Sequence, residues 1–288
     1  MSALPPVLPH FSEIAADYDA LFCDVWGVVH NGVRSFPEPC ETLMRARARG
    51  TAVIFITNAP RPNGVVARQL ENFQVPRETY DTIISSGDVS RSVIIKRAGQ
   101  SIYHLGPERD RAIFSGLDVR FAPPESADYV VCSGLLDDDN ESPDDYREML
   151  AGMLERKQFM LCGNPDVVVE RGDHLVYCAG AIADLYASMG GEVLYAGKPY
   201  RPIYDMALAA AESALGRKPE LGRVLAIGDS VRTDLTGAHA FGIDILFITS
   251  GIHAEELGGR DKPDAHAISG LFAAAGRLPK AVMRQLVW

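Results

Sequence analysis

Two acidic residues lie where short apolar runs of this chain end, and a third follows one of them closely. Asp24 and Asp229 each directly follow such a run, and Asp234 lies about one helical turn after Asp229. If the fold brings them together, each pair of carboxylates repels by about 4 kcal/mol at a separation of about 4 Å and an effective dielectric of about 20. A cation must offset this repulsion, and a set of oxygen ligands suits Mg²⁺. The spacing therefore predicts a magnesium site.

A hydroxyl and a lysine follow two other apolar runs. Thr57 ends the run 52–57 and, with the backbone N–H group of Asn58, offers a cradle for an anion near the start of the next helix. Lys198 lies in a Gly-Lys-Pro turn and supplies a positive charge. A carboxylate nucleophile, a metal ion, an anion cradle and a lysine are together the parts that phosphoryl transfer through an aspartyl-phosphate needs.

Buried strands that alternate with helices must bring these side chains together. Continuous apolar runs predict strands over 20–23, 52–57, 82–87, 193–196, 223–227 and 243–249. Helical spacing predicts helices over 11–18, 37–49, 63–73, 88–98, 203–215 and 233–241. This alternation predicts parallel βαβ units, in which the carboxyl ends of the strands lie along one edge of the sheet.

The middle of the chain has an α/β pattern of its own. It predicts strands over 101–105, 128–132, 159–162 and 167–169 and helices over 108–116, 143–156 and 180–189. We therefore expect a doubly wound parallel-sheet α/β core in two parts, 1–99 and 191–288, with an inserted α/β domain over 100–190.

Composition excludes several classes of protein. The 288 residues carry a net charge of −10, which argues against a nucleic-acid-binding protein. No apolar stretch is long enough to span a membrane, and residues 1–10 do not resemble a secretory signal. The five cysteines contain no Cys-x-x-Cys pair and are expected to be buried, reduced thiols. The expected compartment is the cytoplasm.

Four short segments resemble, in order, the four motifs of the haloacid dehalogenase (HAD) superfamily: Asp24-Val25-Trp26-Gly27-Val28, Ile56-Thr57-Asn58, Gly197-Lys198-Pro199, and Gly228-Asp229-Ser230 with Asp234. The insertion between the second and third motifs is similar to that of subclass IIA, the NagD-like phosphatases with a C2-type cap. Asn164-Pro165-Asp166 and Gly190-Gly191 also resemble segments of that subclass. The resemblance implies a Rossmann-like core with a cap domain.

The resemblance also implies a role for each motif residue. Asp24 would attack phosphorus, Thr57 and Asn58 would bind the phosphoryl group, and Lys198 would hold Asp24 and the transferring oxygens.

The metal ligands implied by the resemblance are the carboxylates of Asp24 and Asp229 and the main-chain carbonyl of Trp26. Asp234 would bind Mg²⁺ through water or orient Lys198.

The cap would select a small phosphorylated metabolite, and Asn164, Asp166 and Arg171 are candidate contacts with it. Homodimers that form through the cap occur in this subclass, so a homodimer is compatible with the resemblance.

Trp26 departs from the family pattern. Phosphatases of the superfamily carry a second Asp at this position, which protonates the leaving group and then activates water. Indole cannot exchange a proton near neutral pH, and loss of a general acid costs about 10²–10⁴-fold in rate, or about 3–5 kcal/mol of barrier. An acidic leaving group would need no protonation, or His30 could replace the missing acid.

These observations favour a Mg²⁺-dependent phosphatase with weak or narrow activity. One alternative is a non-catalytic phosphoester-binding or regulatory protein that keeps the fold, which Trp26 favours. Another is a different reaction of the superfamily, such as dehalogenation, although metal-independent chemistry would leave the acid cluster without a cation.

Overall fold

The computed structural model describes residues 5–171 and 174–288. The chain divides into two compact units. One contains the chain up to Thr57 together with Ala67–Ile84 and Tyr204–Trp288, and the other contains Asn58–Val66 and Ser85–Ile203. The second unit therefore takes in 85–99 and 191–203, which the expected boundaries assign to the core. Those boundaries, at residues 99/100 and 190/191, stay a prediction.

A six-stranded sheet forms the centre of the first unit, in the order β13-β12-β11-β1-β2-β3. Every residue of β1 and β2 is buried, as continuous apolar runs predict. The strands are β1 (Ala20–Cys23), β2 (Ala52–Thr57), β3 (Thr82–Ser85), β11 (Val224–Gly228), β12 (Asp244–Ile248) and β13 (Ala281–Met283).

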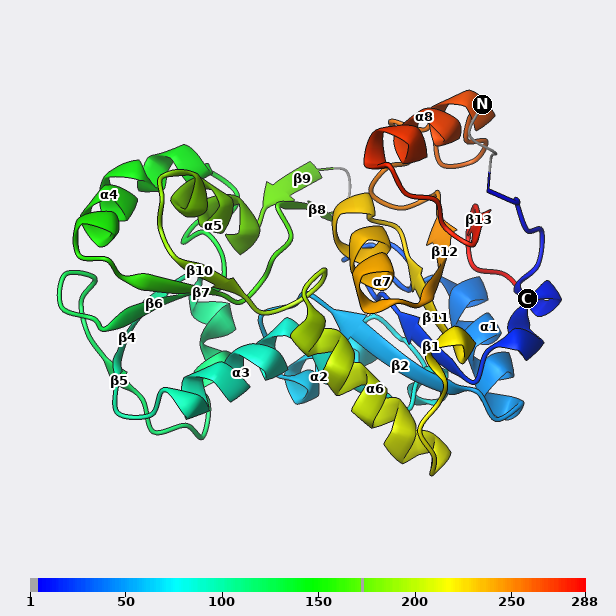
Figure 1. Ribbon diagram of the computed structural model, residues 1–288, viewed down its shortest axis with the longest axis horizontal. Helices are drawn as coiled ribbons and strands as arrows, with labels where there is room; N and C mark the ends of the chain where they lie inside the picture. Colours follow the sequence, from blue (N-terminus) through cyan, green and yellow to red (C-terminus); the bar gives the residue numbers. More distant parts are fainter. Residues whose placement is uncertain (1–4, 172–173) are drawn as a thin grey trace. The chain divides into compact units, whose positions relative to one another are not determined.

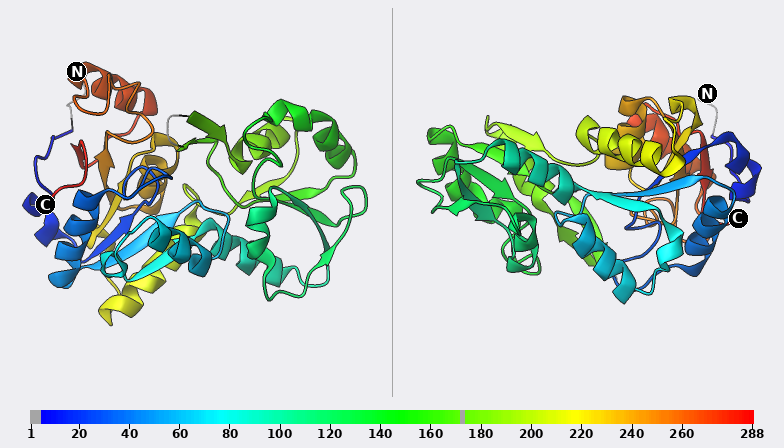
Figure 2. Two further views of the ribbon diagram at one scale, coloured as in Figure 1. Left: turned by 180° about the vertical axis from the view of Figure 1, so that it is seen from behind. Right: turned by 90° about the horizontal axis from the view of Figure 1, so that it is seen from below.

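Helices cover both faces of this sheet, with α6 and α7 on one face and α1 and α2 on the other (Figures 1 and 2). The helices are α1 (Pro37–Ala48), α2 (Asn63–Asn72), α6 (Arg201–Leu215), α7 (Thr236–Phe241) and α8 (Ala265–Ala275). Neighbouring strands from β2 through β1, β11 and β12 to β13 pair in parallel. The predicted doubly wound α/β core is confirmed.

The second unit has a parallel five-stranded sheet in the order β10-β7-β6-β4-β5. β10 pairs with β7 here, although the expected boundary at residue 191 places it in the core. The strands are β4 (Ser101–Leu105), β5 (Arg120–Phe121), β6 (Tyr129–Cys132), β7 (Phe159–Cys162) and β10 (Val193–Tyr195). The helices are α3 (Ser86–Lys96), α4 (Arg147–Glu155) and α5 (Ala179–Ser188).

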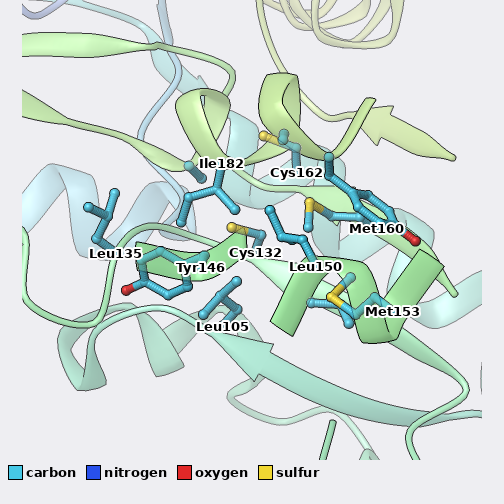
Figure 3. Packing of buried hydrophobic residues seen from close by; sticks show 13 residues of the cluster. Leu105, Cys132, Leu135, Tyr146, Leu150, Met153, Met160, Cys162 and Ile182 are labelled. Atoms are coloured by element: carbon cyan, nitrogen blue, oxygen red, sulfur yellow. The ribbon is translucent and has the colours of Figure 1, made fainter. Parts of the chain in front are cut away.

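Side chains from α4 and α5 pack against this sheet in one apolar cluster (Figure 3). Leu150 and Met153 of α4, Ile182 of α5 and Met160 of β7 are all fully buried in it. Burial of such side chains stabilises the fold by about 1.5–3 kcal/mol each, so the inserted segment has a core of its own.

Several predicted elements differ in the structure. The predicted helix 108–116 is a 3₁₀ segment, Glu108–Phe114, and the predicted helix 11–18 is two short 3₁₀ turns. β3 ends at Ser85, because its hydroxyl and the Asp88 carboxylate form a capping box, and α3 therefore starts two residues earlier than expected.

Among the strands and α-helices of the described residues, β5, β9 (His174–Tyr177), α8 and β13 have no counterpart in the predictions. The strand β9 pairs antiparallel with β8 (Val168–Arg171). No helix in the described ranges is both long and apolar enough to cross a membrane.

Candidate active site

Three buried carboxylates meet at the carboxyl edge of the first sheet. Asp24 follows β1 and Asp229 follows β11, and these two strands are neighbours in register, with Cys23 opposite Ile227. One oxygen each from Asp24, Asp229 and Asp234 lies within 4.8 Å of the others. The predicted convergence of these three side chains is therefore present.

Glycines allow the backbone to pass close to these acids. A Cβ atom on Gly27 would lie 2.1 Å from Asp229 Oδ2, and one on Gly251 would lie 1.9 Å from the same atom. A Cβ atom on Gly228 would lie 2.3 Å from Asp234 Cγ. Gly27 also has a φ of 88°, which other residues rarely adopt. The carboxylates are thus enclosed by backbone that tolerates no side chain.

Backbone N–H groups orient two of the acids. Ile252 N–H donates to Asp229 Oδ2 at 2.7 Å, and Ser230 N–H donates to Asp234 Oδ2 at 3.1 Å. Asp234 lies in a π-helical turn, Val231–Leu235, which precedes α7, so the helix predicted over 233–241 begins with a different local geometry. Such turns are frequent at functional sites.

The carboxylate set fits a hard cation. Three buried acids supply only oxygen ligands, which is the donor set that Mg²⁺ prefers. Without a cation, the three carboxylates would repel one another in a partly desolvated site, where water screens their charges poorly. Thr57 is buried at the end of β2, the strand beside β1, so its hydroxyl shares this edge of the sheet with Asp24.

Trp26 belongs to a compact loop that follows Asp24. Its ring contacts His30 edge-on, with centroids 5.2 Å apart, and His30 in turn packs on Phe73 at 4.8 Å. A Cβ atom on Gly32 would lie 2.4 Å from Trp26 Cζ2, so the glycine admits the indole. The N–H group of Gly32 donates to His30 Nδ1 at 2.9 Å. A proton given by neutral His30 would therefore come from Nε2.

The other predicted site residues lie in the second unit and hydrogen-bond to one another. Asn58 Nδ2 donates to Asp166 Oδ1 at 2.9 Å and to the carbonyl oxygen of Lys198 at 3.1 Å. Lys198 N–H donates to Asn58 Oδ1 at 2.7 Å, and Asp166 N–H donates to Asn164 Oδ1 at 3.1 Å. Hydrogen bonds within the second unit thus join Asn58, Asn164, Asp166 and Lys198.

Arg171, the remaining candidate cap contact, is engaged in ion pairs with Asp138 and Asp139. Gly251 and Ile252, which shape the Asp229 site, were missed by sequence reasoning. The available signal was a Ser-Gly pair, Ser250-Gly251, directly after the apolar run 243–249, at a strand end on the same edge of the sheet.

Comparison with known proteins points to one family. The sequence profile of the haloacid dehalogenase-like hydrolases matches residues 21–120, and a HAD-hydrolase-like profile matches residues 195–271. No curated protein matches the chain.

The chain is also similar to several proteins of solved structure. A haloacid dehalogenase-like hydrolase from Brucella suis 1330 is 45% identical, aligns over 97% of this chain and 100% of its own, and gives a TM-score of 0.87. A possible sugar phosphatase of the HAD superfamily from Cytophaga hutchinsonii is 19% identical over 98% of both chains, with a TM-score of 0.76. A p-nitrophenyl phosphatase from Archaeoglobus fulgidus is 20% identical over 93% of this chain and 97% of its own, with a TM-score of 0.71. The last two share the fold.

Proposed function

Because the chain belongs to the haloacid dehalogenase-like hydrolase family, we propose that it is a Mg²⁺-dependent phosphatase that hydrolyses a small phosphoester through an aspartyl-phosphate on Asp24. The observation that carries this proposal is the cluster of three buried acids, in which one oxygen each from Asp24, Asp229 and Asp234 lies within 4.8 Å of the others. Asp24 and Asp229 follow adjacent strands, and Asp234 lies in the turn after Asp229. The phosphatase names of two fold relatives agree with it.

The metal would be held by Asp24, Asp229 and the main-chain carbonyl of Trp26, with Asp234 as a further acid at the site. When bound, Mg²⁺ supplies positive charge that offsets the carboxylates and the phosphoryl oxygens. The hydrogen bonds from Ile252 to Asp229 and from Ser230 to Asp234 keep these side chains oriented before the metal arrives.

In the reaction, an oxygen of Asp24 forms a bond to phosphorus while the bond from phosphorus to the leaving oxygen breaks. The Thr57 hydroxyl and the backbone N–H of Asn58 bind the phosphoryl oxygens, and Lys198 supplies the positive charge that the family motif assigns to it. Water then attacks phosphorus and the bond from phosphorus to the Asp24 oxygen breaks, which regenerates the Asp24 carboxylate. Inorganic phosphate leaves with the hydroxyl group of that water, and the other proton of the water passes to solvent.

Trp26 restricts the substrates that react well. No carboxyl group at position 26 can protonate a leaving alkoxide, so the favoured leaving groups are those stable as anions, as in aryl or acyl phosphates. The substrate is a small phosphorylated metabolite of that kind, and Asn164 and Asp166 remain candidates for contact with it. From the sequence, we place the enzyme in the cytoplasm, and a homodimer stays compatible with the family resemblance.

The test is release of phosphate from a panel of aryl, acyl and alkyl phosphoesters, with and without Mg²⁺. Asp24→Asn, which keeps the shape of the side chain but removes the nucleophile, is the matched control. Turnover that requires both Mg²⁺ and Asp24 supports the proposal. If no phosphoester is turned over faster than by Asp24→Asn, the enzyme proposal fails, and the second candidate, a phosphoester-binding protein, is favoured by the missing acid at Trp26.

A further inference from the structure

The side chain of Asn58 forms hydrogen bonds with both backbone polar groups of one residue, Lys198. Its Oδ1 atom accepts the Lys198 N–H at 2.7 Å, and its Nδ2 atom donates to the Lys198 carbonyl at 3.1 Å. Both residues are 3% exposed. Buried hydrogen bonds of this kind are costly to leave unmade, so the Lys198 backbone has little freedom to move.

The remaining hydrogen of the Asn58 amide is also engaged. Nδ2 donates to Asp166 Oδ1 at 2.9 Å. A carboxamide has only two N–H donors, and Lys198 and Asp166 take both. The Asn58 side chain therefore has no donor left for a phosphoryl oxygen, which leaves only its backbone N–H for the substrate role expected from the sequence.

Close packing supports the same turn. A Cβ atom on Gly197 would lie 2.5 Å from Asn58 Oδ1 and 2.8 Å from Pro165 Cδ. Only glycine lets the backbone before Lys198 approach Asn58 and the Pro165 ring this closely.

Asp166 is itself fixed to the inserted domain. Its N–H donates to Asn164 Oδ1 at 3.1 Å, and its carbonyl accepts the N–H of Gly180, in the first turn of α5, at 3.1 Å. A Cβ atom on Gly180 would lie 2.4 Å from that carbonyl oxygen. A continuous set of short contacts thus runs from the start of α5 through Asp166 and Asn58 to Lys198.

We propose that Asn58 and Asp166 are positioning residues that hold Lys198 in place for phosphoryl transfer, and that Asp166 ties the Lys198 turn to helix α5 of the inserted domain. This inference rests on the proposed phosphatase function. The side chain of a lysine is flexible. A fixed backbone at Lys198 therefore limits the positions that its ammonium group can reach. A misplacement of about 1 Å costs about 10²-fold in rate.

The experiment compares Asn58→Ala, Asp166→Ala and Asp166→Asn with wild type, using p-nitrophenyl phosphate as the probe. Asp118→Ala, which removes an exposed carboxylate of the same unit, is the control for general effects. Hydrogen exchange at the Lys198 amide is measured on the same proteins, and circular dichroism confirms that each variant is folded.

Removal of an orienting partner typically costs about 10–100-fold in activity. We expect kcat to fall by about that factor in Asn58→Ala and by about tenfold in Asp166→Ala, with little change in KM and faster exchange at Lys198. Asp166→Asn keeps an acceptor oxygen, so most of the loss should be rescued.

Two results would overturn the inference: a rise in KM with kcat unchanged, which indicates direct substrate contact, or Lys198 exchange that is unaltered in Asn58→Ala. Failure of the phosphatase proposal appears separately, as wild-type turnover no higher than that of Asp24→Asn. The exchange measurement then still decides whether Asn58 and Asp166 hold the turn.

Discussion

Replacing Trp26 with Asp should restore the general acid that this site lacks. A carboxyl group at position 26 can protonate a leaving alkoxide, and a positioned general acid contributes about 10²–10⁴-fold, or about 3–5 kcal/mol of barrier. Hydrolysis of alkyl phosphates should therefore accelerate by about that factor in Trp26→Asp. Aryl phosphates, whose leaving groups need no protonation, should gain less, because the new carboxylate can help them only when water attacks the aspartyl-phosphate.

The same substitution should reduce stability by an amount that the loop geometry indicates. The indole packs edge-on against His30 at 5.2 Å and fills the space beside Gly32. An aromatic pair of this kind contributes about 0.5–1.5 kcal/mol beyond the burial of its surface. The free energy of unfolding, measured with urea, should fall by at least about 1 kcal/mol.

Trp26→Asn is the control, because it removes the same indole without supplying an acid. Steady-state rates on an alkyl and an aryl phosphate, across a range of pH, separate the two effects. Only the Asp variant should lose activity as rising pH deprotonates the new carboxyl group. Equal gains in Trp26→Asp and Trp26→Asn would show that indole bulk, not the missing proton donor, limits the rate. No gain in either would refute the reasoning and mean that the site has adapted to indole.

Three further outcomes are expected. Gly27→Ala should weaken Mg²⁺ binding in calorimetric titration, because its Cβ atom would collide with Asp229. It should also destabilise the fold by at least about 1 kcal/mol, because the φ of residue 27 is 88°. Unchanged Mg²⁺ affinity would contradict this. Burial lowers the pKa of His104 to about 4, so the unfolded chain binds more protons between that pH and its own pKa of about 6.5. The free energy of unfolding should therefore decrease as pH falls through this window, more steeply than in His104→Gln; parallel curves would contradict it. All five cysteines are buried, and desolvation raises the pKa of Cys132 to about 12. The native protein should therefore react slowly with a thiol reagent, and the denatured protein should yield five thiols. Rapid labelling of the native protein would contradict the burial.

The site acids could be predicted from the sequence because their positions follow from strand periodicity. A continuous apolar run that ends in a polar residue identifies the carboxyl end of a buried strand, and parallel pairing then brings such ends together. This reasoning located Asp24, Thr57 and Asp229. It could not locate the end of β3, because Ser85 fits a strand equally well until its side-chain bond to Asp88 is known.

Long-range side-chain contacts could not be predicted in the same way. Asn58 bonds to residues 108 and 140 positions away, and no periodic pattern encodes such pairs. β8 was predicted as a strand over 167–169, but its partner β9 was missed. The residues of β9 are mostly exposed, so the apolar alternation that marks a strand is weak there. Pairing of β10 with β7 was missed because chain order suggested that the core had already resumed.

That pairing sets a limit on recombination between relatives. A chimera that exchanges the inserted segment with a junction at residue 190 would take β7 from one parent and β10, the strand that pairs with it, from the other. Where the two sequences do not fit, the pairing at this edge of the sheet would weaken, and an edge with unpaired backbone groups promotes intermolecular strand pairing. Junctions placed after β10 keep β7 and β10 from the same parent. The contacts of Asp166 and Asn58 with the Lys198 turn are preserved only if residues 58–66 and 196–199 also come from the same parent.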